Sequence, residues 1–208
     1  MFYKSRFVAI LFYAATLYPL STVYFTPRDD IKAQLVELIK AERKSIDAAM
    51  YMLTDKVVAQ ALIDAYVRGV QVTLVLDQVS MSERFGKGVM LQKSGIKVFV
   101  HKTETFNSFS MPLMHHKFFI FGMNDSSKKS LLWTGSFNCS VAAATLHDEN
   151  VIVCDDVVII AEYRKCFKQL TARLGGSKSL TIEDAQDVCE EKIADTLLEN
   201  IEAEFQNK

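Results

Sequence analysis

The segment MHHKF at residues 114–118 holds the strongest chemical signal in the chain, because an imidazole and an ammonium stand two residues apart. Side chains alternate between the two faces of a strand, so a strand here would put His115 and Lys117 on one face and His116 on the other. A neutral imidazole can attack phosphorus, and a nearby cation offsets the charge of the non-bridging oxygens. The spacing therefore indicates phosphoryl chemistry, with His115 as the nucleophile and Lys117 as the cation.

Two later segments supply groups that suit the same chemistry. In TGSFN, at 134–138, Ser136 and Asn138 alternate and could donate hydrogen bonds to phosphate oxygens, while Gly135 would let the backbone approach an anion closely. Glu149 could bind the far nitrogen of His115 and set its tautomer. The candidate catalytic residues are His115, Lys117 and Glu149, and the candidate phosphate-binding residues are Lys117, Ser136 and Asn138.

Other polar residues lack such partners in the sequence. His101 and His147 are expected on the surface, although His147 is close enough to Glu149 in sequence to line the same pocket. Asp47 and Asp77 lie in or at the ends of expected strands, where a lone acid can start a loop as readily as serve a site, so they receive no role. The irregular apolar loop at 106–114 could pack in the core or form a lip that contacts acyl chains or bases.

Hydrophobic periodicity predicts the elements that must position these groups. Strands at 23–27, 45–53, 70–76 and 96–100 alternate with helices at about 29–43, 55–69 and 82–93, as in right-handed crossover units. A hairpin follows at 117–121 and 131–134, then a strand at 151–153 and a helix at 157–174. The predicted fold class is α/β, with a mixed, largely parallel β-sheet flanked by helices on both faces.

Both ends of the chain differ in character from this domain. Lys4 and Arg6 precede an apolar run at 7–20 that is typical of an export signal, although a retained anchor or a buried first element would also fit. At the other end, nine acids and three bases accompany one apolar helical stripe. We therefore predict a signal peptide or membrane anchor at 1–21, one catalytic domain at 22–176 and an acidic amphipathic helix at 177–208.

Composition narrows the choice of partner. The net charge of the 208 residues is −1, which excludes nucleic-acid binding driven mainly by bulk charge. Between residues 83 and 117, however, six bases face two acids, so an anionic polymer or an anionic lipid surface would be attracted there. The four cysteines are too widely spaced to indicate a disulfide framework or a zinc site.

Taken together, MHHKF, TGSFN and ENVIV, after the opening VYFTP, make the chain resemble the phospholipase D superfamily, whose motif is HxK(x4)D followed by GSxN and an acid. The sequence is most similar to the small single-motif branch that contains a bacterial periplasmic endonuclease and the mitochondrial cardiolipin hydrolase. The resemblance implies the phospholipase D/nuclease fold, a phosphohistidine at His115, and no metal or other cofactor. Since the chain has one motif copy, it also implies a homodimer in which the His115 residues of two subunits face each other.

One motif position departs from the family pattern. Gly122 stands where the motif has aspartate, and Asn124 and Asp125 are candidate replacements. Three functions follow from these observations: a phospholipid hydrolase, an exported endonuclease that cleaves DNA or RNA, and a phosphate-binding homologue that has lost catalysis. The apolar run at the start favours the phospholipid hydrolase, acting at a membrane surface and exported to, or anchored in, the cell envelope or periplasm.

Overall fold

The computed structural model describes residues 21–82, 84–102 and 112–175. The expected leader up to residue 20, most of the apolar loop before His115 and the acidic C-terminal helix lie outside these ranges. Ser21, which we assigned to the end of the leader, already pairs with Cys154 in the first strand. No helix in the described part of the chain is long and apolar enough to cross a membrane.

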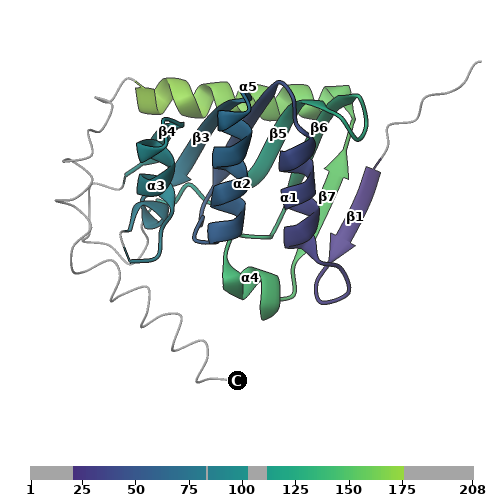
Figure 1. The fold of residues 1–208 in the computed structure, drawn as a ribbon, viewed down its shortest axis with the longest axis horizontal. Coiled ribbons are helices and arrows are strands. Elements are labelled where there is room, and N and C mark those ends of the chain that lie inside the picture. The colour runs from purple at the N-terminus through teal and green to yellow at the C-terminus, as the bar shows by residue number, and fades with distance from the viewer. Residues whose placement is uncertain (1–20, 83, 103–111, 176–208) are drawn as a thin grey trace, which may run out of the picture.

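Seven strands form one sheet in the order β1-β7-β6-β5-β2-β3-β4 (Figure 1). Their bounds are Ser21–Phe25 for β1, Ser45–Met50 for β2, Gln71–Asp77 for β3, Lys97–His101 for β4, Lys117–Asn124 for β5, Lys129–Gly135 for β6 and Asn150–Cys154 for β7. Each of these strands overlaps a segment predicted from the sequence.

The sheet is mixed, as predicted, but the expectation that it is largely parallel is wrong for its pairings. Only β2–β3 and β3–β4 are parallel, and the other four neighbouring pairs are antiparallel. The reason is that the crossover from β1 to β2 passes over three positions of the sheet, and β5, β6 and β7 fill these positions. Strand order depends on this tertiary choice, which local periodicity does not reveal.

Helices cover both faces of the sheet, which confirms that part of the prediction. The helices α1 (Ile31–Ala41), α2 (Lys56–Val67) and α3 (Gly88–Lys93) share a hydrophobic core on one face, and α5 (Val157–Gly175) crosses the other (Figure 1). A short helix, α4 (Val141–Thr145), was not predicted. Carboxylate caps start α1 at Asp30 and α2 at Asp55.

The third helix begins at Gly88, later than predicted; a 3-10 turn at Gln78–Met81 comes before it, and the N–H of Lys87 donates to the carbonyl of Leu53 at 3.0 Å. Ser80 in this turn is fully buried, and its hydroxyl accepts from the N–H of Leu53 at 2.8 Å and donates to the carbonyl of Tyr51 at 3.0 Å. These bonds hold the turn against the end of β2 and delay the helix to Gly88.

Strand directions define two edges of the sheet. At one edge, which we call the site edge, β1, β2, β3, β4 and β6 end and β5 and β7 begin. Lys117 pairs there with Met50, and Gly135 pairs with Val151. At the opposite edge, which we call the far edge, β2 begins at Ser45 and β5 ends at Asn124. The sheet thus brings the MHHKF and TGSFN segments to one edge.

Candidate active site

His115 and Lys117 meet at the site edge, as their spacing predicted. Nζ of Lys117 lies 3.2 Å from both Nδ1 and Nε2 of His115, and it donates to the His115 carbonyl at 3.0 Å. His115 precedes β5, which begins at Lys117, so the pair is formed at a strand entry and not within a strand. The His116 ring instead lies 5.7 Å from that of Phe118, which packs in the core beneath α5.

Tyr51, which follows β2, was not identified from the sequence. Its ring centroid lies 4.6 Å from that of His115, and Nζ of Lys117 lies 5.2 Å from the Tyr51 centroid. Its backbone N–H also donates to the carbonyl of His116 at 2.8 Å. Tyr51 therefore fixes the His115 segment from both its backbone and its aromatic face.

Asp77, at the end of β3, is the second residue that sequence reasoning missed. This buried carboxylate accepts from the N–H of Met114 at 2.9 Å and from that of Val79 at 3.2 Å, and Nδ1 of His101 lies 3.5 Å away. Asp77 thus holds the residue directly before His115. The available signal was an acid at the carboxyl end of a parallel strand, the usual place for site residues in such sheets.

These neighbours shift the ionisation of the pair. Burial and the Lys117 charge lower the pKa of His115, whereas the Asp77 charge acts in the opposite direction. Burial also lowers the pKa of Lys117, and the nearby Glu149 carboxylate partly offsets that effect. A His115 whose pKa lies below its ordinary value is mostly neutral near pH 7, as a nucleophile must be.

Ser136 and Glu149 are brought together, in an arrangement that the sequence did not predict. The Ser136 hydroxyl donates to Oε2 of Glu149 and accepts from the N–H of Asn150 at 3.0 Å. Oε1 of Glu149 lies 3.7 Å from Nδ1 of His147, as its place in the sequence had suggested. Within the described residues no hydrogen bond joins Glu149 to His115, so the tautomer-setting role of Glu149 stays a prediction.

Thr26, in the turn directly after β1, also holds Glu149. The N–H of Glu149 donates to the Thr26 hydroxyl at 2.7 Å, and the N–H of Thr26 donates to the Glu149 carbonyl at 3.0 Å. Gly135 is required nearby, because a Cβ on it would lie 2.0 Å from the Asn150 carbonyl oxygen. The two strands that carry Ser136 and Glu149 can approach only with glycine at this position.

The side chain of Asn138 has an unsatisfied hydrogen-bonding atom. Its Oδ1 is buried and has no hydrogen-bond partner among the described residues. The next residue is fixed, since the Cys139 carbonyl accepts from the N–H groups of Thr54 and Asp55 at 2.9 and 2.8 Å. Buried polar atoms usually have a partner. The buried Oδ1 could only accept a hydrogen bond, so it is the Nδ2 amide group of Asn138 that could donate to a phosphate oxygen.

Comparisons with known proteins agree with this geometry. The family described as "Cardiolipin synthase, PLD-like domain" matches residues 35–171. A phospholipase D of Rickettsia bellii is 33% identical over 73% of this chain and 69% of its own length, and that of Rickettsia typhi is 33% identical over 67% and 62%. The mitochondrial cardiolipin hydrolase of Xenopus laevis is 28% identical over 65% of this chain and 58% of its own length.

Two solved structures share the fold. NucT from Helicobacter pylori has a TM-score of 0.65 at 21% identity, covering 74% of this chain and 97% of its own. Nuc from Salmonella typhimurium, a phospholipase D family member, has a TM-score of 0.59 at 24% identity, covering 73% and 93%. The chain therefore belongs to the phospholipase D-like family, and a phosphodiesterase of the phospholipase D type fits both its relatives and its site.

Proposed function

We propose that the chain is a phospholipase D-type hydrolase that acts through a phosphohistidine at His115, in a site completed by a second copy of the chain. The observation that carries the proposal is the Lys117 ammonium, 3.2 Å from both ring nitrogens of an exposed, largely neutral imidazole. Such a pair offers a nucleophile and a cation to one phosphate.

The proposed reaction has two steps. A ring nitrogen of His115 attacks phosphorus and the bond to the leaving oxygen breaks, while Lys117 and the Asn138 amide bind the non-bridging oxygens. The partner subunit's His115, which must be in its protonated imidazolium form for this step, gives a proton to the leaving oxygen and becomes neutral. It then removes a proton from water, which attacks the phosphohistidine and frees the first imidazole.

An exposed apolar face beside the site supports the second copy. Val23 and Ile152 are directly paired on β1 and β7, and Phe25 lies on the same face two residues on. All three are more than a third exposed. This face adjoins Thr26, which binds Glu149. An exposed apolar face next to a half-site suits a partner that supplies the other half.

Mixing subunits tests the shared site. His115→Ala chains would be refolded together with an equal amount of wild-type chains, so that subunits pair at random. Because both histidines serve one site, we expect about one quarter of the activity of all-wild-type protein, whereas independent subunits would give about one half. The result of one half would contradict the shared site and leave the nucleophile intact.

The interface itself can be broken by one charge. Ile152→Asp should give a monomer in sedimentation equilibrium and lose activity, because the aspartate would be buried against apolar side chains. Val67→Asp, at an exposed position at the end of α2, is the matched control and should change neither property. A dimeric and active Ile152→Asp variant would place the interface elsewhere.

Phospholipid is the substrate that we propose, since the relatives in the comparisons are named phospholipase D and cardiolipin hydrolase. Three exposed apolar side chains also favour it: Leu113, two residues before His115, and Val141 and Leu146, at the start and just past the end of α4. Such side chains can enter the acyl region of a bilayer.

A double substitution distinguishes the lipid from the nucleic-acid alternative. Val141→Ser with Leu146→Ser should slow hydrolysis of vesicles of anionic phospholipid about tenfold and leave hydrolysis of soluble bis(p-nitrophenyl) phosphate unchanged, because only binding to the lipid surface is lost. The matched control is Val67→Ser. Cleavage of DNA that falls steeply with salt, together with inert vesicles, would instead support the nuclease.

A further inference from the structure

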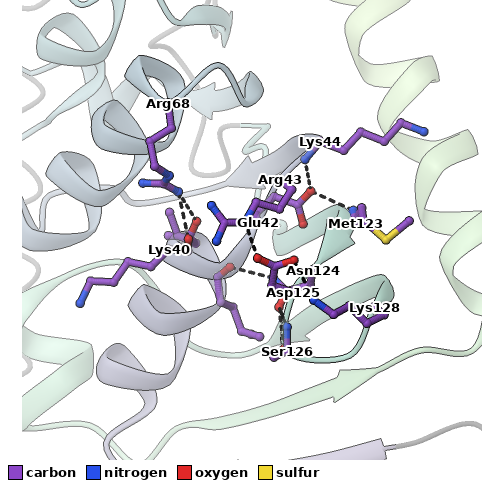
Figure 2. Close-up of polar contacts among 12 residues, drawn as sticks. Lys40, Glu42, Arg43, Lys44, Arg68, Met123, Asn124, Asp125, Ser126 and Lys128 are labelled. Carbon is purple, nitrogen blue, oxygen red and sulfur yellow. Dashed lines mark hydrogen bonds and ion pairs between the residues drawn. The ribbon is translucent and has the colours of Figure 1, made fainter.

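The far edge of the sheet contains a buried carboxylate that is unrelated to the reacting groups. Glu42 directly follows α1 and is fully buried. Its Oε1 accepts from the N–H groups of Lys44 and Met123, both at 2.8 Å (Figure 2). It also accepts from the N–H of Ser45 at 3.0 Å. One carboxylate oxygen therefore joins the start of β2 to the end of β5.

The end of β5 needs such an acceptor. The register of β5 against β6 shifts between Phe121 and Asn124, which is the signature of a bulge. A bulge leaves backbone groups without ladder partners, and a buried N–H must then find another acceptor. For Met123 that acceptor is Glu42, while the Met123 carbonyl accepts from the N–H of Arg43 at 3.1 Å.

Gly122 lies directly against the same backbone. A Cβ built on Gly122 would lie 2.4 Å from Oγ of Ser45, 3.2 Å from its backbone nitrogen and 3.4 Å from Cβ of Lys44. A side chain at 122 would thus point at the residues whose N–H groups Glu42 binds. An aspartate there would compete with Glu42 for those groups, and two carboxylates in one buried site repel each other.

The two residues that seemed able to replace the motif aspartate have other partners. Nδ2 of Asn124 donates to the Leu38 carbonyl at 2.8 Å, and the N–H of Asp125 donates to the Ala41 carbonyl at 2.8 Å, so both cap the last turn of α1. The Asp125 carboxylate forms ion pairs with Arg43 and Lys128 near the surface (Figure 2). Neither side chain reaches the N–H groups that Glu42 binds.

We infer that Glu42 is the carboxylate that anchors the end of β5 in this chain: from its position after α1 it binds the N–H groups beside Gly122, so that position 122 needs no acid. The inference rests on the proposed function in one respect, since β5 carries Lys117. It means that the backbone N–H groups beside Gly122 have an acceptor although position 122 carries no acid.

The test removes the carboxylate at position 42 and places one at position 122. In a Ser45→Ala background, which removes the oxygen nearest to residue 122, thermal unfolding would be measured for Glu42→Ala, Gly122→Asp and the combination. Glu42→Ala should lower the midpoint by about 5–10 °C, because three N–H groups lose their acceptor. Gly122→Asp should also lower it. The combination should unfold at a higher temperature than either single variant.

Amide hydrogen exchange gives an independent readout. The N–H groups of Lys44, Ser45 and Met123 should lose protection in Glu42→Ala and regain it in the combination. Glu42→Gln, which keeps one acceptor oxygen, should lie between wild type and alanine. A combination no more stable than the worse single variant, or failing to fold, would overturn the inference. Neither readout requires turnover, so an inactive wild-type protein would refute the proposed function without affecting this result.

Discussion

The two edges of the sheet each hold a buried carboxylate that binds backbone N–H groups, but they differ in what remains open. At the far edge Oε1 of Glu42 binds three backbone N–H groups, its Oε2 is buried without a hydrogen-bond partner among the described residues, and no part of the side chain reaches the surface. At the site edge Asp77 fixes Met114, yet the side chain of His115 next to it stays exposed. The comparison separates a scaffold from a prepared binding site.

The largest loss of activity should come from removing the charge of Lys117 at the site edge. Lys117→Met should lower kcat on bis(p-nitrophenyl) phosphate by about 10³-fold, because the charge that binds the non-bridging oxygens is lost. Stability should change little, since the substitution removes a buried charge and keeps most of the side-chain volume. Lys97→Met, a cation on β4 that lies over Phe99, is the control and should keep full activity. An active Lys117→Met enzyme would remove the distinction between the edges.

Replacing each buried carboxylate by the corresponding amide compares the two edges directly. Asp77→Asn should reduce kcat about tenfold with a small change in unfolding midpoint, because the segment before His115 loses a charged acceptor but keeps an oxygen. Glu42→Gln should do the reverse, lowering the midpoint while kcat stays within about twofold. Parallel losses of activity and stability in both variants would show that the two carboxylates do the same job.

The sequence predicted the reacting pair better than its surroundings, for a physical reason. His115 and Lys117 are two residues apart, so local geometry decides whether they meet. Asp77 and Tyr51 reach the site only because β2 pairs with β5 and β3 pairs with β2, and strand order is a tertiary property. The same applies to Glu42, which lies 80 positions before Gly122 and meets its neighbours only after α1 packs on the sheet.

The prediction of helices and strands from the sequence was limited in the same way, because some elements depend on tertiary contacts. Periodicity located α1, α2, α5 and all seven strands, but α4 has only five residues and depends on the Ser140 cap. The late start of α3 follows from the burial of Ser80, which a local pattern of polar and apolar residues does not reveal.

A smaller effect concerns the ionisation of His115. Its pKa is lowered by burial and by Lys117, so NMR titration should place it below the ordinary value of 6.5. Lys117→Met should raise this pKa and Asp77→Asn should lower it, because the two charges act in opposite directions. Shifts of the same sign would contradict the geometry.

The lowered pKa of His115 also determines how its contribution to folding stability changes with pH. The unfolded state binds the His115 proton more readily than the folded state, so this residue's contribution to stability is present above the unfolded pKa and is lost as the pH falls from there through the lower pKa of the folded state. His115→Ala should therefore reduce the loss of stability between pH 7 and pH 5, as measured by urea unfolding at each pH. An unchanged slope would contradict a lowered pKa.

The most direct test of the central claim is hydrolysis of bis(p-nitrophenyl) phosphate in excess chelator by the wild type, His115→Ala and His116→Ala. His116 is the matched control, because its ring lies beside that of Phe118 and, among the described residues, the Lys117 ammonium forms its hydrogen bonds with His115 and not with His116. We predict turnover by the wild type and His116→Ala, and a fall of at least about 10³-fold in His115→Ala. Turnover that survives in His115→Ala, or a folded wild-type dimer without turnover, would contradict a phosphohistidine mechanism at this site.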